Sequence, residues 1–504
     1  MPLLAAIDLG SNAIRLVIAE VDPERHITVR DYVREPVRLG QDVFRGGVIS
    51  GETIARSVGA FRTFREAIDR HGARWTRAIA TSAVREALNR DIFLAAIAEA
   101  TAIHVTPVTE EEEARLIHRA VANSVDLKNK IALLVDIGGG STEITLANDE
   151  GILSTESYRM GSVRLLEMRT GGEDSDESQF NHLVEEYVET TRRRLRREIG
   201  SRKIDLCVGT GGSLEALGDL RRELLAREKD SLLPIVDLET ILRKLQGLSY
   251  EERVRQLRLR PDRADVIVPA AIIIQKIMSQ AGVDELLIPH VGLKDGLLLD
   301  MTDELYGEKT SLRRDQVLLS ARELGRKYAF DEQHATTVAR LALELFDKSR
   351  TVHGLGLEQR LLLEVAALLH DIGTFVGASE HHKHTHYLVM ASPIVGLSRD
   401  QVALVASVAR YHRKSMPKQS HDAYRGLSGK ERDTVSKLAA IVRLADALDN
   451  EHASKVKTVE VQWKKPKFIL RLHGEGDLLL EKWALMKKAG MFEEVFDAKV
   501  VVEA

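Results

Sequence analysis

Several residue types are scarce in this chain, and each shortage excludes a class of protein. Its 504 residues contain a single cysteine, Cys207, so no intrachain disulfide can form. That composition fits a reducing compartment. Aromatic residues make up only 5% and do not alternate with the basic runs, so bases would find no surface to stack on. We therefore expect no nucleic acid partner.

Long apolar runs and a strong net charge are also missing. No stretch of about 18 consecutive apolar residues occurs, so we expect no membrane-spanning helix and no membrane partner. The N-terminal segment MPLLAAIDLG meets an acid too early to be a signal peptide, and we expect a cytoplasmic protein. The formal net charge is −4, so a polyanion would have to be held by a local basic patch.

The patterns that are present predict several domains. A chain of this length is too long for one core. Residues 1–125 and 126–303 each alternate strands with helices, which predicts two α/β domains. Residues 310–450 carry apolar side chains at helical spacing and hardly any strand pattern, so we expect a helical domain. Residues 451–504 return to strands and are expected to form a small α+β domain.

Two short stretches of the α/β part resemble each other. Residues 5–17 read AAIDLGSNAIRLV, and residues 133–146 read LLVDIGGGSTEITL. In each, an apolar strand ends in an aspartate, Asp8 or Asp136, and a turn of small residues leads into a second strand. The acid can hold a divalent cation while bare backbone N–H groups face phosphoryl oxygens. Single Asp-Gly hairpin turns are common, but two copies 128 residues apart predict paired domains that clamp a phosphate.

Glu113 stands out within an acidic segment. The helix that contains it begins after Thr109, which is expected to form a T-x-x-E capping box with Glu112. Most acids at a helix start simply offset the helix dipole. Glu113, however, lies three and four residues before Leu116 and Ile117 and therefore shares their apolar face. Burial there would raise its pKa and suit it to general-base catalysis, the alternative being a buried acid with satisfied hydrogen bonds.

Two glycine loops are candidate phosphate sites. Asp136 and Glu143 flank the triple glycine of VDIGGGSTEI, so both carboxylates can reach the turn and hold a hard cation together with water. The segment VGTGGS (208–213) follows a strand and opens a helix, where backbone N–H groups bind anions. Ordinary glycine turns are the alternative, although triple glycine between buried strands is poor for stability.

Arg85 lies in the segment ATSAVREALN. The pattern predicts a helix over residues 83–100, with Ser82 as its cap and Arg85 at about its third position. Taken alone, such a residue is an ordinary exposed arginine.

Six motifs occur together in the order of a known family. IDLGSNAIRLVIAE, ATSAVREALN, EEARLI, VDIGGGSTEI, GTGGS and HVGLKDGLL resemble the exopolyphosphatase / guanosine pentaphosphate phosphatase family, over residues 1–303. The resemblance implies the fold of the actin, Hsp70 and sugar kinase superfamily, with two ribonuclease-H-like (actin-like ATPase) domains around a cleft. It also implies attack by water on a terminal phosphoryl group with Mg²⁺. By the same analogy we expect a homodimer, with residues 304–504 helping to embrace the partner.

The resemblance also implies roles for individual residues. Glu113 falls on the general base, and Asp136 and Glu143 fall on the acids that bind Mg²⁺ (or another divalent cation) and position the catalytic water. The residues that fall on its phosphate-binding positions are Asp8, Ser11, Asn12, Arg85, Gly138, Gly139, Gly140, Ser141, Gly209, Thr210, Gly211 and Gly212.

The helical segment carries a pattern of histidines and aspartates of its own. The order His334, His370-Asp371, His384, His412, Asp446 resembles HD-domain phosphohydrolases, whose histidines and aspartates bind metals. Longer exopolyphosphatases carry a degenerate HD-like third domain, often without metal. Here His334, His370, Asp371 and Asp446 are all present and form a candidate second metal site. The alternative is a helical scaffold with surface histidines.

We expect an exopolyphosphatase that removes the terminal phosphate of inorganic polyphosphate processively, with Mg²⁺ and Glu113. Within the family the alternative is a guanosine pentaphosphate (pppGpp) 5′-phosphohydrolase, which uses the same chemistry. The long C-terminal half favours polyphosphate, because a track for a chain needs added surface. An ATP-dependent sugar or acid kinase would need a purine pocket near GTGGS. An inactive regulatory binder is disfavoured by the intact Glu113, Asp136 and Glu143.

Overall fold

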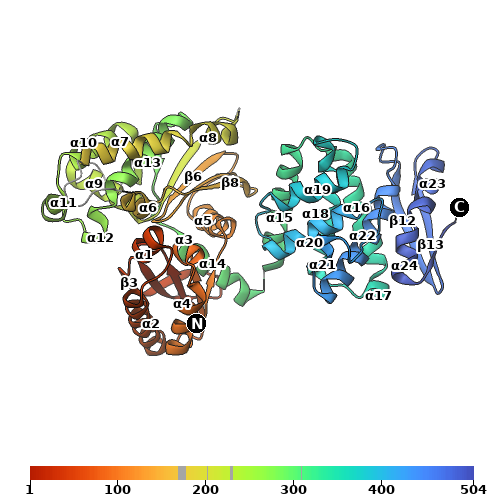
Figure 1. Cartoon of the computed structure of the whole chain (residues 1–504), viewed down its shortest axis with the longest axis horizontal. Coiled ribbons are helices and arrows are strands. Elements are labelled where there is room, and N and C mark those ends of the chain that lie inside the picture. Colours follow the sequence, from red (N-terminus) through yellow and green to blue (C-terminus); the bar gives the residue numbers. More distant parts are fainter. Residues whose placement is uncertain (169–176, 201, 227–230, 308, 504) are drawn as a thin grey trace. The chain divides into compact units, whose positions relative to one another are not determined.

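The computed structural model describes residues 1–168, 177–200, 202–226, 231–307 and 309–503. It divides into two compact units, Met1–Leu312 and Arg313–Ala504 (Figure 1). The boundary lies close to residue 310, where the sequence predicts the helical domain to begin. The finer division into four domains stays a prediction.

The first unit contains two mixed sheets. The sheet nearer the N-terminus has the strand order β3-β2-β1-β4-β5, and the other has the order β10-β11-β9-β6-β7-β8. The strands of the first are β1 (Leu3–Leu9), β2 (Ile14–Val21), β3 (Ile27–Glu35), β4 (Trp75–Ala80) and β5 (Val105–Pro107). Those of the second are β6 (Ala132–Ile137), β7 (Thr142–Ala147), β8 (Ile152–Tyr158), β9 (Leu206–Thr210), β10 (Leu232–Pro234) and β11 (Glu285–Leu287).

The two sheets repeat one arrangement of strands. β1 pairs antiparallel with β2 on one side and parallel with β4 on the other. β6 pairs in the same way with β7 and β9. The similar segments of the sequence therefore form equivalent hairpins at the centres of two similar sheets.

Helices cover these sheets. In the described residues of the first unit they are α1 (Leu39–Gly46), α2 (Gly51–His71), α3 (Ser82–Glu86), α4 (Arg90–Thr101), α5 (Glu110–Ser124), α6 (Ser162–Glu167), α7 (Glu177–Glu189), α8 (Arg192–Ile199), α9 (Gly212–Leu225), α10 (Ile235–Gln246), α11 (Tyr250–Gln256), α12 (Pro261–Ala264), α13 (Ile267–Ala281) and α14 (Leu293–Tyr306). The predicted single helix over 83–100 is wrong, because a turn after Glu86 divides it into α3 and α4.

Strand β1 shows how one sheet is buried on both faces. Ala5 and Ile7 belong to the apolar cluster that contains Phe61 of α2. Leu4 and Ala6 belong to a second cluster on the other face, with residues of α5 and α14. Successive side chains of a strand point to opposite faces, so an uninterrupted apolar strand requires cover on both.

Helices α5 and α14 cross at very close range. A Cβ atom placed on Gly296 of α14 would overlap the backbone carbonyl of Leu116 in α5. Glycine lets the two backbones touch where any larger residue would separate them. α5 begins with the acidic segment, and α14 begins with the GLKDG motif, so this crossing fixes two parts of the later site relative to each other.

The segment Pro261–Ala281 has the length and composition of a membrane-crossing helix, and 67% of it is buried inside the protein. Within it, Ile272, Ile273 and Ile274 of α13 are fully buried. They belong to the apolar cluster that fills one face of the second sheet. The described part of α13 thus serves as a core helix of the first unit.

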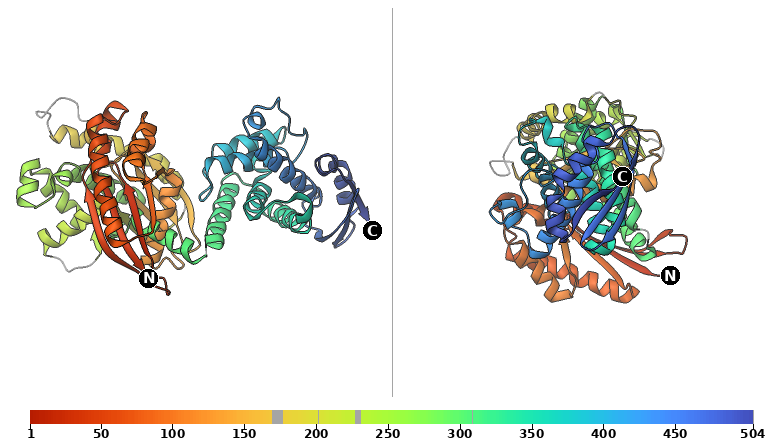
Figure 2. Two further views of the ribbon diagram at one scale, coloured as in Figure 1. Left: turned by 90° about the horizontal axis from the view of Figure 1, so that it is seen from below. Right: turned by 90° about the vertical axis from the view of Figure 1, so that its right-hand side faces the viewer.

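The second unit is helical with a small sheet at its end. Its elements are α15 (Lys309–Lys327), α16 (Glu332–Lys348), α17 (Arg350–His353), α18 (Leu357–Leu369), the 3₁₀ helix η1 (Ile372–Phe375), α19 (His381–Met390), α20 (Arg399–Arg410), α21 (Asp422–Arg425), α22 (Gly429–Ala447), β12 (Val456–Lys464), β13 (Lys467–Gly474), α23 (Leu479–Lys488), α24 (Gly490–Phe496) and β14 (Lys499–Glu503). The chain ends beside this sheet, whose order is β12-β13-β14 (Figure 2). One apolar cluster joins α16, α18 and α22 to the sheet, so the helices and the sheet share a core.

Candidate active site

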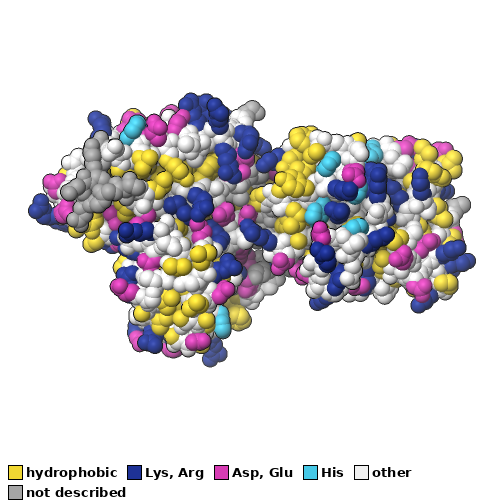
Figure 3. Space-filling view, viewed as in Figure 1, with side chains coloured by type: hydrophobic (Ala, Val, Ile, Leu, Met, Phe, Trp, Pro, Cys, Tyr) yellow, Lys and Arg dark blue, Asp and Glu magenta, His cyan; other side chains and the backbone are white. Residues whose placement is uncertain are grey.

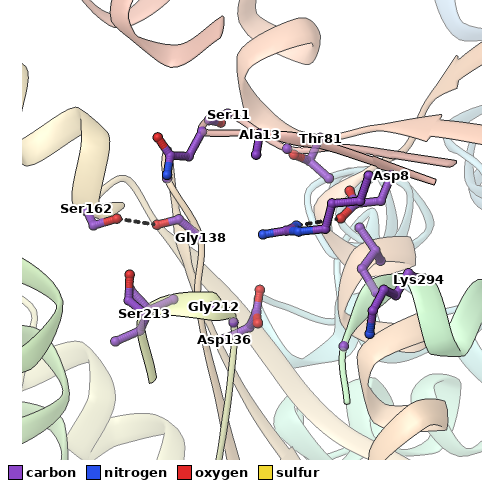
Figure 4. Close-up of a pocket in the computed structure, with 18 of the residues that line it drawn as sticks. Asp8, Ser11, Ala13, Thr81, Asp136, Gly138, Ser162, Gly212, Ser213 and Lys294 are labelled. Atoms are coloured by element: carbon purple, nitrogen blue, oxygen red, sulfur yellow. Dashed lines mark hydrogen bonds and ion pairs between the residues drawn. The ribbon is translucent and has the colours of Figure 1, made fainter. Parts of the chain in front are cut away.

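A pocket of about 380 Å³ lies within the first unit (Figure 4). It forms where the central strands β1, β4, β6 and β9 end, which is the edge at which α/β sheets usually bind ligands. Its lining includes most of the predicted site residues, namely Asp8, Ser11, Asn12, Glu113, Asp136, Gly138, Gly139, Ser141, Gly211 and Gly212.

The two hairpin turns in this pocket have the same backbone bond. The Gly10 N–H donates to the Ala13 carbonyl over 3.1 Å, and the Gly138 N–H donates to the Ser141 carbonyl over 3.1 Å. Each pair of residues sits 128 positions from its counterpart (138 − 10 and 141 − 13). The duplicated pattern in the sequence thus forms a duplicated turn in space.

The residues facing the two aspartates differ. In the register of the first hairpin Asp8 lies opposite Arg15, and in the second Asp136 lies opposite Glu143. Arg15 Nη1 donates to Asp8 Oδ2 over 2.9 Å, the ion pair drawn in Figure 4. The first hairpin is therefore internally neutral at this position, whereas the second presents two acids.

Three carboxylates meet beside the second hairpin. One oxygen each from Glu113, Asp136 and Glu143 lies within 4.8 Å of the others. Burial raises the pKa of Asp136 to about 6. Burial and the charge of Asp136 raise the pKa of Glu143 to about 7. Grouping buried acids is costly unless a cation compensates them.

Glu113 occupies the position that its spacing predicts. It is buried on the same face of α5 as Leu116 and Ile117, which confirms the predicted burial. Burial, followed by the negative charge of Glu143, raises its pKa well above the usual range. Arg85 Nη1 lies 3.4 Å from Glu113 Oε2 and partly offsets this effect.

Two details of the predicted helix starts are wrong. Thr109 accepts a hydrogen bond from the Glu112 N–H, but the Glu112 side chain pairs with Arg115 instead of closing the capping box. Ser82 is the first residue of α3 rather than its cap, and its hydroxyl lies 3.0 Å from the hydroxyl of Ser11. In both cases a partner contributed by another part of the fold or by the next turn competes with the local cap.

The glycine loop before α9 has the geometry of an anion site. Gly211 has φ of +97°, and a Cβ atom there would lie 2.7 Å from the Ile137 carbonyl oxygen. Gly212 begins α9, where a Cβ atom would lie 2.6 Å from an Arg263 nitrogen. Both glycines leave the N-terminal N–H groups of α9 open to the pocket, where the helix dipole favours an anion.

Some predicted residues lie behind the pocket surface. Thr210 donates from its hydroxyl to Asp136 Oδ1 over 2.5 Å and so orients that acid. Gly209 lies inside β9 against Leu214. Gly140, Arg85 and Glu143 also stand outside the described lining: Gly140 packs against Phe44 and Ser82, and the other two contact the acids.

Three cations of the pocket were not predicted. Arg15, Arg263 and Lys294 line it, and Lys294 is labelled in Figure 4. Arg15 and Lys294 stand inside two of the quoted motifs, so their charge beside a phosphate loop was an available signal. Arg263 has no such signal, because its position depends on the fold, which sets its Nη1 2.5 Å from Ser213 Oγ.

The acids of the pocket fit a hard divalent cation. Glu143 Oε2 and Asp8 Oδ1 are buried and have no hydrogen-bond partner among the described residues. Oxygen atoms without partners, grouped with Asp136 and Glu113, are the donor set that Mg²⁺ prefers. Bound positive charge would also lower the raised pKa values of these acids.

The predicted histidine cluster assembles in the second unit. Oxygen and nitrogen atoms of His334, His370 and Asp446 lie within 4.8 Å of one another, and so do those of Asp371, His381 and His412. The histidine that α19 contributes is His381, not the predicted His384, because His381 faces His412 across the helix pair. Neither this cluster nor the first pocket includes the other, since each lies in its own unit.

Comparisons with known proteins agree with this geometry. A model of the Ppx/GppA phosphatase family matches residues 17–305, and a model of domain III of that family matches residues 318–489. Guanosine-5'-triphosphate,3'-diphosphate pyrophosphatase of Vibrio vulnificus is 28% identical over 449 residues, covering 88% of this chain and 87% of its own. Exopolyphosphatase 2 of Mycobacterium tuberculosis is 31% identical over 317 residues, covering 59% of this chain and 98% of its own.

A solved structure agrees as well. The crystal structure of an exopolyphosphatase from Cytophaga hutchinsonii superimposes with a TM-score of 0.56 at 26% identity, covering 60% of this chain and 98% of that one. The first family match spans more than half of the 504 residues and includes both hairpin acids of the second sheet and Glu113. The chain therefore belongs to the Ppx/GppA phosphatase family, with an α/β unit of that family's fold followed by a helical part that matches its domain III.

Proposed function

We propose that this chain is an exopolyphosphatase that hydrolyses the terminal phosphoanhydride bond of inorganic polyphosphate. The observation that supports this most is the pocket itself, in which three buried carboxylates face phosphate-binding turns and the cations Arg15, Arg263 and Lys294. Tyr32 is the one Phe, Tyr or Trp among the described residues that line it. A lining with several cations and little aromatic surface suits a chain of phosphates that carries no base.

In this proposal Glu113 is the general base. Its raised pKa makes it a better proton acceptor than an exposed glutamate, and it would take a proton from the attacking water. Arg85, 3.4 Å away, would hold the carboxylate in place. The N–H groups of the turns and of α9, with Arg15 and Arg263, would bind the oxygens on which negative charge develops.

Asp136 and Glu143 would hold Mg²⁺ or another divalent cation, with Asp8 close by. When bound, the cation would neutralise charge on the terminal phosphate. Asp136 is already oriented by Thr210, and Glu143 accepts from the Ser157 hydroxyl over 3.0 Å. These bonds would fix the acids before the cation and substrate arrive.

The second candidate function is hydrolysis of the 5′-phosphate of pppGpp. The observation in its favour is that the Vibrio vulnificus relative, named for that substrate, aligns with 88% of this chain and so includes the helical part. The pocket chemistry would be unchanged. The two candidates differ in what lies beyond the terminal phosphates.

The test is phosphate release by the full-length protein with Mg²⁺, from long-chain polyphosphate and from pppGpp. We expect faster release from polyphosphate and a fall in kcat of roughly 10²- to 10⁴-fold in Glu113→Gln. Glu111→Gln, on the same turn but outside the described lining, is the matched control and should stay active. Preference for pppGpp would move the chain to the second function, and an active Glu113→Gln would refute the assigned base.

We also propose, from family analogy, a cytoplasmic homodimer and an HD-like fold for the helical part, followed by a small α+β domain. Sedimentation of the purified chain tests the dimer. A monomer at micromolar concentration that is fully active would refute it.

A further inference from the structure

Six side chains of the second unit converge although they come from distant parts of the sequence. His334 lies on α16, and His370 and Asp371 lie between α18 and η1. His381 begins α19, His412 follows α20, and Asp446 lies near the end of α22. We call these six residues the imidazole cluster. All four histidines are buried, whereas the Asp371 side chain keeps 28% of its surface exposed.

The histidine rings are held in one orientation by their Nδ1 atoms. Nδ1 of His370 and of His412 donate to the carbonyls of Ala367 and Ala409, over 2.8 and 2.6 Å. Nδ1 of His381 lies 3.2 Å from the Ala378 carbonyl. A carbonyl oxygen can only accept, so each bound Nδ1 carries the hydrogen and the neutral ring presents a bare lone pair at Nε2.

His334 is held in the same way by an acid. Its Nδ1 lies 2.8 Å from Asp449 Oδ2, and both side chains are almost completely buried. Hydrogen bonds from one ring nitrogen to a carbonyl or carboxylate are the usual support for a histidine that binds metal through the other nitrogen. The same support occurs on every histidine of the cluster.

The free Nε2 atoms face the two aspartates and one another. Nε2 of His334 and of His370 each lie 3.8 Å from Asp446 Oδ1. Neither nitrogen has a hydrogen-bond partner in the described part of the chain. Buried polar atoms without partners cost free energy, so an atom outside the protein is expected between them.

Asp371 joins this group to the other pair of histidines. Its Oδ1 lies 3.1 Å from His381 Nε2, 3.3 Å from His412 Nε2 and 3.8 Å from His370 Nε2. Nε2 of His381 and of His412 are 3.2 Å apart, so two lone pairs face each other. Arg413 also approaches His381 Nε2 over 3.2 Å, which places one positive charge at the rim.

We propose that the imidazole cluster binds two divalent transition-metal ions side by side, with Asp371 as the shared ligand. One ion would be held by His334, His370 and Asp446, and the other by His381 and His412. Ligand atoms about 2.1 Å from one ion at tetrahedral or octahedral angles lie roughly 3.0–3.5 Å apart, close to the separations here. Imidazole-rich ligand sets favour manganese, iron, cobalt or zinc over magnesium.

This centre differs in chemistry from the pocket of the first unit. The pocket offers oxygen atoms alone, which suit Mg²⁺, whereas the imidazole cluster offers four nitrogens. Figure 3 shows histidine side chains reaching the surface of the second unit in the region of α18 and α19, among Lys and Arg side chains. With Asp371 partly exposed, ions can enter from solvent.

The test is metal loading of the full-length protein. After treatment with EDTA, the chain is dialysed against Mn²⁺ or Co²⁺ in excess Mg²⁺, and bound metal is counted by mass spectrometry. We expect two transition-metal ions per chain and an exchange-coupled Mn²⁺ signal in electron paramagnetic resonance. One ion or none per chain would overturn the paired site.

Variants locate the ions. Asp371→Asn should lose the coupled signal and at least one ion, with its circular dichroism unchanged. His382→Gln is the matched control: it neighbours His381 on α19 and is buried, but belongs to none of the groups of converging ligand atoms found in the described residues. Glu143→Gln changes only the first pocket and should keep both ions. Equal metal loss in His382→Gln, or full binding by Asp371→Asn, would refute the assignment.

Discussion

At the scale of single residues, the two hairpins differ at one paired position. Arg15 faces Asp8 in the first, and Glu143 faces Asp136 in the second. A duplicated turn therefore serves two purposes: the first hairpin brings a cation to the pocket, and the second brings a pair of acids. Duplication set the shape of both turns, and a single side chain at the paired position changes the charge.

Arg15→Gln tests that division. It leaves Asp8 buried without its ion-pair partner, so we expect the free energy of unfolding to fall by about 1–3 kcal/mol and KM to rise. Urea denaturation of Arg15→Gln, Asp8→Asn and the double variant measures the coupling. The double variant should lose less than the sum of the single ones, and strictly additive losses would show that the pair contributes nothing.

His118 on α5 gives a pH dependence. Burial lowers the pKa of its imidazole to about 4 from its usual value of 6.5. Between pH 6.5 and 4 the unfolded chain binds a proton that the folded chain does not, so stability falls as the pH falls through this range. At about 1.4 kcal/mol per pKa unit the effect is at most ~3 kcal/mol.

The measurement compares His118→Gln with the unchanged chain by urea denaturation at pH 7.5 and pH 5. We expect the variant to lose less stability than the unchanged chain on acidification. Equal losses in both proteins would mean that His118 titrates normally in the folded state.

At the scale of elements, the crossing of α5 and α14 positions the catalytic glutamate. α5 carries Glu113, and the start of α14 brings Lys294 to the same pocket. Gly296→Ala would force the two backbones apart, because its Cβ would overlap the Leu116 carbonyl. We expect a loss of about 1–3 kcal/mol in stability and a lower kcat in the part that still folds.

Gly59→Ala is the matched control for that change. Gly59 is an exposed interior residue of α2, and nothing lies within 4 Å of its added Cβ. Alanine favours a helix over glycine, so this variant should gain up to about 1 kcal/mol. Thermal unfolding with phosphate release measures both. A harmless Gly296→Ala would show that the helices can separate without consequence.

At the scale of the whole molecule, the two units have separate apolar cores. The described clusters of the first unit share no residue with that of the second. Exopolyphosphatase 2 of Mycobacterium tuberculosis matches 59% of this chain with 98% of its own, so a relative exists with about the length of the first unit. Both facts favour independent folding.

Cys207, the one cysteine, reports on the first unit alone. It is 2% exposed, and burial raises the pKa of its thiol to about 12, so it should resist thiol reagents until that unit unfolds. We expect its labelling in urea to have the same midpoint in the full chain and in a fragment ending at residue 312. A midpoint shift worth more than about 1 kcal/mol would show that residues 313–504 stabilise the first unit.

Local sequence determined much of the fold. The duplicated hairpins, the α/β and helical parts and the buried face of Glu113 follow from spacing, because side-chain direction repeats within a strand or helix. The failures are also local in origin. The turn after Glu86 divides a predicted helix, and Glu112 turns to Arg115 instead of closing its cap. Periodicity shows which face is apolar, but it shows poorly where a helix ends.

Only the tertiary structure decided which distant residues meet. Arg263 enters the pocket from a segment without motif, and His381 replaces His384 in the imidazole cluster. Spacing along one helix cannot show which of two nearby histidines faces another helix, since that depends on how the helices pack. The sequence by itself therefore determined the chemistry available in each unit, and packing decided which of those groups come within bonding distance.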